Sequence, residues 1–265
     1  MNIYRHEMRA NRKSLIYWCI GAFLLIATGV GKYSALSASE QSASALISHM
    51  PRLFRIIIGV GDFDITTPLG FFGVLYIYLV LMAAIHAAML GDQIIAKEER
   101  DKTAEFLLVK PVSRTNIITA KLWAALTNIL VYSLVNWGAS IFLIRTLTGE
   151  SGITAGITRM TAGMLLLQLI FLFLGTALAA SHRGVEKSAS TITVILIGTF
   201  MLSILIDLES RLKVLKVLTP FKYFPAADLI LKGSLNTGYI IWSWVLILGF
   251  ISLTYFSYRD KEINL

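Results

Sequence analysis

The sequence predicts an all-α, polytopic membrane protein with six transmembrane helices and both termini in the cytoplasm. Three observations lead to this prediction: an apolar composition, six long stretches without charged residues, and an uneven distribution of lysine and arginine. Of the 265 residues, 56% are hydrophobic and 15% are charged, whereas soluble domains contain about 25% charged residues. A mean hydropathy of +0.70 also excludes a disordered chain, which is poor in hydrophobic residues.

The predicted spans are the six stretches that lack Asp, Glu, Lys and Arg. A helix that crosses a hydrocarbon core of about 30 Å needs about 20 mostly apolar residues. β-Barrel strands are excluded because they are shorter and alternate in polarity. Small residues within the spans, as at 138–140 and 175–177, predict close approach of neighbouring helices. Residues 1–265 therefore form one transmembrane domain, with spans at 15–30, 68–90, 122–144, 160–180, 189–206 and 239–256.

The orientation follows from the basic residues. With six spans, both termini and the segments 91–121 and 181–188 lie on one side of the membrane. Fourteen of the 24 Lys and Arg residues fall in the 62 positions on that side, against ten in the 84 positions of the opposite loops. Basic residues concentrate in cytoplasmic loops, so both termini are expected in the cytoplasm. Topology thus accounts for the net charge of +8, and a nucleic-acid partner is not needed.

The spans carry no constellation of catalytic groups. All acidic and basic residues lie outside the six stretches, which weakens an ion-coupled transporter or an intramembrane enzyme. His86 is the one imidazole within a span, and we expect it to make a helix-packing hydrogen bond rather than to bind a metal. Cys19 is the single cysteine, so an intrachain disulfide is excluded. No phosphate-binding loop motif is present, and we assign no catalytic, cofactor-binding or metal-binding residue.

Residues 91–121 form the most informative cytoplasmic segment. Its first half is predicted to be a charged helix that continues from the second span. Pro111 then requires a turn, and Ser113 and Thr115 are both candidate N-caps of the next helix. An apolar patch at 106–108 lies among charged residues. A loop that needs only to be soluble has no reason to carry such a patch, which therefore indicates a docking partner.

This segment resembles the signature of ABC-2 type permeases, the membrane subunits of ATP-binding-cassette exporters. The resemblance rests on the acidic start at Glu98, the run Asp-Lys-Thr-Ala-Glu-Phe-Leu-Leu at 101–108, and the later Pro111, Ser113-Arg114 and Lys121. Many relatives have glycine where Lys102 stands, and a branch of the family shares the lysine. Segments 64–71, 218–224 and 258–260 also resemble relatives, whereas 130–205 matches in hydropathy pattern only.

The resemblance implies that this loop is a coupling helix that binds a cleft on a separate ATPase subunit. Charged positions would select the partner, and 106–108 would be the apolar anchor. The implied coupling residues are Glu98, Glu99, Arg100, Lys102, Thr103, Glu105, Phe106, Leu107, Leu108 and Pro111. A second, smaller contact is implied for the short loop at 181–188, with His182, Arg183 and Lys187.

The function implied by the resemblance is that of a permease subunit, not an enzyme, in the cell (plasma) membrane of a bacterium. Two ATPase subunits, which carry ATP and Mg, would drive export through a pathway formed with a second copy or a similar permease. The lipid bilayer is the remaining partner. The alternative is a sensor or scaffold that recruits a partner through the same loop and moves nothing. An intramembrane enzyme ranks lower, because it would need a constellation of an acid, a His pair or a nucleophile at membrane depth, and that constellation is absent.

The N-terminal residues 1–14 are basic and amphipathic, and they resemble the interfacial helix of the family, which lies along an anionic leaflet. A basic stretch, an apolar stretch and small residues at 34–38 are also typical of a signal peptide. An Ala/Ser-rich loop produces this pattern by chance, so we expect the segment to be retained as the first span.

Residues 207–238 are too polar to span the membrane. Leucines at near-helical spacing predict an interfacial amphipathic helix, followed by a break at 220–225 and a short helix through Leu231. ABC-2 permeases have re-entrant helices here that help to close the outer gate. Periodicity alone fits equally well a helix that floats on the surface. The leucines are Leu208, Leu212, Leu215 and Leu218.

Overall fold

The computed structural model describes residues 3–37, 51–59, 63–101, 113–149, 152–182 and 184–260. These residues form helices and no strands. The long helices are α1 (Ile3–Ser37), α4 (Pro68–Arg100), α6 (Arg114–Thr148), α7 (Thr154–Ser181), α8 (Val185–Leu208) and α10 (Thr237–Asp260). All six are long and apolar enough to cross a membrane. The prediction of an all-α protein with six membrane-spanning helices is therefore confirmed.

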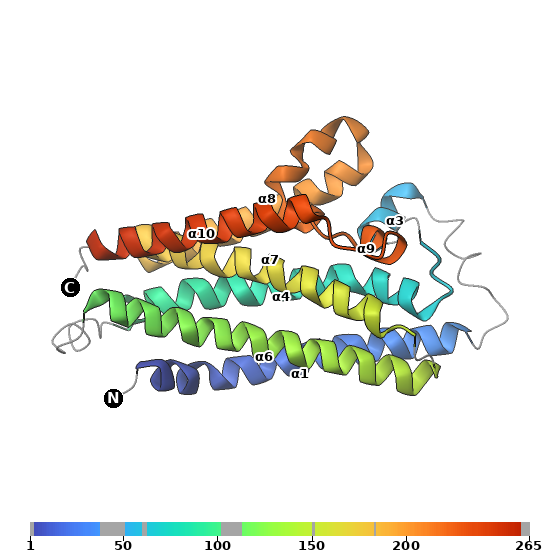
Figure 1. Cartoon of the computed structure of the whole chain (residues 1–265), viewed down its shortest axis with the longest axis horizontal. Helices are drawn as coiled ribbons and strands as arrows, with labels where there is room; N and C mark the ends of the chain where they lie inside the picture. Colours follow the sequence, from blue (N-terminus) through green and yellow to red (C-terminus); the bar gives the residue numbers. More distant parts are fainter. Residues whose placement is uncertain are drawn as a thin grey trace.

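The six long helices form a bundle with both termini at the same end (Figure 1), which we call the terminal end. The short helices α3 (Arg52–Ile58) and α9 (Ala226–Leu231) lie at the opposite end. In α4, α6 and α7, 56–67% of the most apolar window is buried, against 17–22% in α1, α8 and α10. Helices α4, α6 and α7 thus form the core, and helices α1, α8 and α10 expose apolar side chains around it.

The contact between α4 and α7 is the most extensive in the bundle. A Cβ atom placed on Gly91 would lie 2.1 Å from the backbone oxygen of Leu172, and one on Gly175 would lie 2.7 Å from that of Ala88. Neither position has room for a side chain, so the two backbones touch. The predicted close approach at 175–177 is confirmed. At Gly138, by contrast, an added Cβ would meet nothing within 4 Å.

The residues at 64–71 form the turn before α4 and the first residues of this helix. Thr67 is the N-cap, and its hydroxyl accepts a hydrogen bond of 3.1 Å from the backbone N–H of Gly70. Pro68 occupies the first helical position, where a missing N–H costs nothing. The backbone N–H and hydroxyl of Thr66 both donate to the carboxylate of Asp64, and these bonds lower the pKa of Asp64. The turn before the span is thus closed by side-chain hydrogen bonds.

The helices that flank the segment 102–112 begin and end close to the predicted places. Helix α4 continues from the second span to Arg100, as expected. Of the two candidate N-caps of α6, Ser113 is confirmed, because its hydroxyl accepts from the backbone N–H of Asn116 at 3.3 Å. Thr115 lies inside the helix and is not the cap.

The N-terminal residues do not form a separate interfacial helix. Residues 3–14 are the first turns of α1, which continues without a break to Ser37. No proline or glycine interrupts this part of the sequence before Gly21. Tyr4 forms a hydroxyl–hydroxyl hydrogen bond of 3.1 Å with Thr127 of α6, and Glu7 is buried. Contacts with the bundle therefore hold this segment as a continuation of the span.

The segment after α8 folds into two 3-10 helices, η1 (Ser210–Leu218) and η2 (Pro220–Lys222), followed by α9. The predicted break and the end at Leu231 are confirmed, but the first helix is 3-10 rather than α. The ring of Phe221 lies 5.4 Å from that of Phe171 and 5.3 Å from that of Phe200. The indole of Trp242 donates to the hydroxyl of Tyr223. These contacts insert η2 and Tyr223 into the bundle, whereas η1 is largely exposed, with Val214 84% and Leu218 63% exposed.

The hydrogen bond expected for His86 is absent at its Nδ1 atom, which is buried and has no partner among the residues described. The ring packs instead between two aromatic rings, 5.4 Å from Trp18 of α1 and 4.8 Å from Tyr132 of α6. His86 therefore contributes aromatic packing between α1, α4 and α6.

The glycine contact makes a direct prediction. We expect Gly91→Ala to lower the free energy of unfolding by about 1–3 kcal/mol, because overpacking forces the two backbones apart. Gly138→Ala is the matched control, and it should leave stability unchanged or raise it by up to about 1 kcal/mol through helix propensity. Thermal unfolding in detergent, followed by circular dichroism, measures both. Equal melting temperatures for the two variants would contradict a backbone contact at Gly91.

Candidate functional site

The last turn of α4 carries the described part of the predicted coupling segment. Glu98, Glu99 and Arg100 lie there, at the terminal end of the bundle. The other predicted coupling residues lie outside the described residues; they are Lys102, Thr103, Glu105, Phe106, Leu107, Leu108 and Pro111. The structure therefore places the base of this segment and the start of the helix that follows it.

A buried ion pair joins the two helices at the base of the segment. The Nζ atom of Lys121 in α6 lies 2.5 Å from Oε2 of Glu98 and 2.5 Å from the backbone oxygen of Ile94. Lys121 has no exposed surface, and the side chain of Glu98 is 17% exposed. A charge this deeply buried is costly unless it is paired and hydrogen-bonded. Glu98 thus points inward and fastens α4 to α6.

Arg100 and Asp101 lie at the surface beyond this pair. Their side chains form an ion pair of 3.3 Å, with exposed fractions of 50% and 45%. A pair so exposed contributes little to stability. Glu99 is half-buried beside them. Among the described residues of the coupling segment, Arg100 is therefore the one best placed to contact another protein.

Two further polar contacts tie α4 to its neighbours near the terminal end. The hydroxyl of Ser188 in α8 donates a 2.6 Å hydrogen bond to the buried carboxylate of Asp92. Asp92 lies against the start of α8, where a negative charge is favoured by the helix dipole. The carboxylate of buried Glu7 in α1 lies 3.9 Å from the ammonium group of Lys97. Together with Glu98, these residues link α4 to α1, α6 and α8.

The start of α6 is attached in turn to the end of α10. The guanidinium of Arg114 donates to the backbone oxygen of Arg259 at 3.1 Å. The hydroxyls of Thr119 and Tyr255 are 2.8 Å apart. Arg114 thus supplies a donor to a C-terminal helix carbonyl, and the base of the segment 102–112 is joined to the last span.

The second predicted contact lies between α7 and α8 at the same end. His182 is half-buried, and its Nδ1 is 3.0 Å from the backbone oxygen of Leu178. Lys187 is exposed in the first turns of α8. Arg183 lies outside the described residues. Within the described part of the chain, no group of three or more His, Cys, Asp or Glu side chains could hold a metal ion.

Sequence reasoning missed the inward-facing ionisable residues, although helical spacing marks them. Lys121 follows Ile117 by four residues and precedes Ala124 by three, so it lies on the same buried face of α6. Glu98 follows Ile94 by four residues, and Asp92 follows Ala88 by four. In each case the spacing places a charged residue on an apolar stripe.

These six helices and their polar attachments define a multi-pass membrane protein. Comparison with protein families matches residues 1–263 to the family described as ABC-2 family transporter protein. The chain belongs to this family, and so it is a transmembrane permease of the ABC transporter class. No match was found among curated proteins. Family membership implies ABC ATPase partners in general.

The ion pair at the base of the segment predicts a strongly coupled double-mutant cycle. Glu98→Gln or Lys121→Met alone should lower the free energy of unfolding by about 3 kcal/mol, because each leaves a charge buried without its partner. The double variant should lose less than the sum of the two. Arg100→Gln, which breaks only an exposed pair, is the control and should stay within about 0.5 kcal/mol of the wild type. Additive losses in thermal unfolding would show that the two side chains do not interact.

Proposed function

We propose that this chain forms the export pathway of an ABC transporter and takes its energy from a separate ATPase through the end of α4. The observation that carries the proposal is the attachment of the C-terminal end of α4 to its neighbouring helices. The buried pair of Lys121 and Glu98 fixes it to α6, and the contact at Gly91 and Gly175 fixes it to α7. A partner that binds Arg100 and the segment 102–112 would therefore move three core helices together.

Helix α4 supports a mechanical route between the two ends of the bundle. Its 33 residues correspond to a rod about 50 Å long. Its first turns lie at the opposite end, beside η2 and α9. ATP and Mg bound on the partner would close the ATPase pair and displace the end of α4. A rigid helix transmits this displacement, and packed interfaces convert it into a change between inward-facing and outward-facing states.

We further propose that the terminal end lies in the cytoplasm of a bacterial cell, because basic residues concentrate on that side of the chain. Six spans without an internal repeat support pairing with a second copy or a similar permease, each with its own ATPase subunit. In the outer helices α1, α8 and α10, only 17–22% of the most apolar window is buried within the chain. Their exposed surface would contact lipid and the second permease.

The experiment is co-purification of the tagged full chain with its ATPase, followed by ATPase assays in proteoliposomes. The Glu105→Lys variant and the double variant Leu107→Asp with Leu108→Asp should insert normally. Both should lower chain-dependent ATPase activity by about tenfold or more, because an apolar anchor and a charge contact are lost from the interface. Lys213→Glu is the control, because Lys213 is an exposed cation in η1. The ATPase activity measured with this variant should equal that measured with the wild type.

Two outcomes would contradict the proposal. Full activity in both variants would remove the coupling role from the segment 102–112. An ATPase that binds the chain but hydrolyses ATP at the same rate without it would favour the sensor or scaffold instead.

A further inference from the structure

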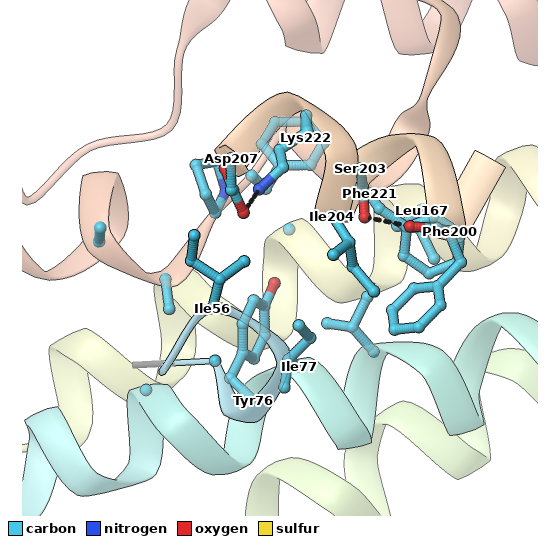
Figure 2. Close-up of a pocket in the computed structure, with 18 of the residues that line it drawn as sticks. Ile56, Tyr76, Ile77, Leu167, Phe200, Ser203, Ile204, Asp207, Phe221 and Lys222 are labelled. Carbon is cyan, nitrogen blue, oxygen red and sulfur yellow. Dashed lines mark hydrogen bonds and ion pairs between the residues drawn. The ribbon is translucent and has the colours of Figure 1, made fainter. Parts of the chain in front are cut away.

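A cavity of about 390 Å³ lies toward the end of the bundle opposite the termini. It is lined by residues of α3, α4, α7, α8, η2 and α9. Figure 2 shows the aliphatic side chains of Ile56, Ile77 and Ile204 around the ring of Tyr76. Leu167, Phe200 and Phe221 extend this apolar wall. The volume falls within the range of small-molecule sites.

Most polar groups of the wall that the structure describes already have partners within the protein. The hydroxyl of Tyr76 donates to the backbone oxygen of Met160 at 3.0 Å. The hydroxyl of Ser203 donates to the backbone oxygen of Phe200, and Lys222 forms an ion pair with Asp207 (Figure 2). These groups hold the wall together and offer little to a neutral polar solute.

Arg55 is the exception. It lines the cavity from α3, and its Nε atom is buried without a hydrogen-bond partner among the described residues. A buried donor without an acceptor is costly, and more so when it carries charge. A guanidinium binds carboxylate or phosphate oxygens best, because its donors form a planar fork that matches them. The cavity thus combines apolar walls with a guanidinium whose Nε atom has no hydrogen-bond partner among the described residues.

We propose that this cavity binds an amphipathic anion, with its acidic head at Arg55 and its hydrocarbon chain between Ile77, Phe221 and the neighbouring apolar side chains. The inference concerns binding and does not depend on the proposed coupling to an ATPase. Two sources share this chemistry: an acidic lipid of the surrounding bilayer, and an acidic amphiphile that the protein transports. Each presents the same head and chain to the cavity.

The test is photolabelling of the purified full chain in nanodiscs of neutral phosphatidylcholine. The probe is decyl phosphate with a photoactivatable group in its chain, and the comparison probe carries a maltoside head. Labelling by the phosphate probe should saturate and map to residues of the cavity wall. Arg55→Gln should weaken it about tenfold or more, because a charge-assisted hydrogen bond is lost, and should leave labelling by the maltoside unchanged. Arg211→Gln removes an exposed arginine of η1 and should change neither.

A second variant tests the apolar part of the site. Ala227 lines the cavity from α9, and Ala227→Phe fills it, so labelling by both probes should fall. Thermal unfolding shows whether each variant is folded, and Arg55→Gln and Ala227→Phe act on different parts of the same site. Equal labelling of Arg55→Gln and wild type by the phosphate probe would overturn the proposal. So would saturable labelling that maps outside the cavity.

Phosphatidylglycerol added to the nanodiscs separates the two sources. Competition with the probe in the wild type, absent in Arg55→Gln, identifies bilayer lipid as the occupant and supports the proposal. If phosphatidylglycerol does not displace the probe, the result also supports the proposal, and the occupant is then a transported amphiphile. No ATPase is present in this assay, so its failure would leave the proposed coupling untouched.

Discussion

Helices α4 and α7 approach so closely that a backbone oxygen of each occupies the space where the other would carry a side chain. Gly91 and Gly175 permit this contact, and the alanines around them keep the surfaces smooth. Within a membrane, burying apolar side chains provides little driving force for helix association. Close packing and interhelical hydrogen bonds must provide it instead. Each of the other long helices packs against this pair: α6 and α8 contact both of its members, and α1 and α10 each contact one.

Charged side chains then fasten α4 to three of its neighbours near the terminal end. Each contact joins α4 to a different neighbour: Glu98 to α6, Asp92 to α8 and Glu7 of α1 to Lys97. The buried pair of Glu98 and Lys121 tolerates little change in geometry, because separating the partners leaves a charge in a medium of low dielectric constant. The region that a partner would push is thereby the region where the helices are least free to move independently.

The sequence predicted the helices well and the inward-facing polar residues poorly. Windows without charge locate the core of each span, since the bilayer fixes a minimum apolar length. They end at the first charged residue, however, and so miss that α4 carries Asp92 inside the protein. The family resemblance implies a coupling role for Glu98, and in the structure its side chain pairs with Lys121. Only its position four residues after Ile94 indicates the buried face. The cavity at Arg55 joins segments far apart in the sequence, which no local pattern reveals.

Helix α4 is the element common to both ends of the molecule. Its last turn carries Arg100 and the base of the segment 102–112, and its first turns place Tyr76 and Ile77 in the wall of the cavity. Because the helix is continuous between them, an axial shift at one end has to appear at the other. Tyr76 lies on this route, and its hydroxyl is bonded to the backbone oxygen of Met160 in α7. Under the proposed coupling, the occupancy of the cavity and the position of the terminal end would be linked, and by reciprocity a ligand at Arg55 would change the affinity of the chain for its partner.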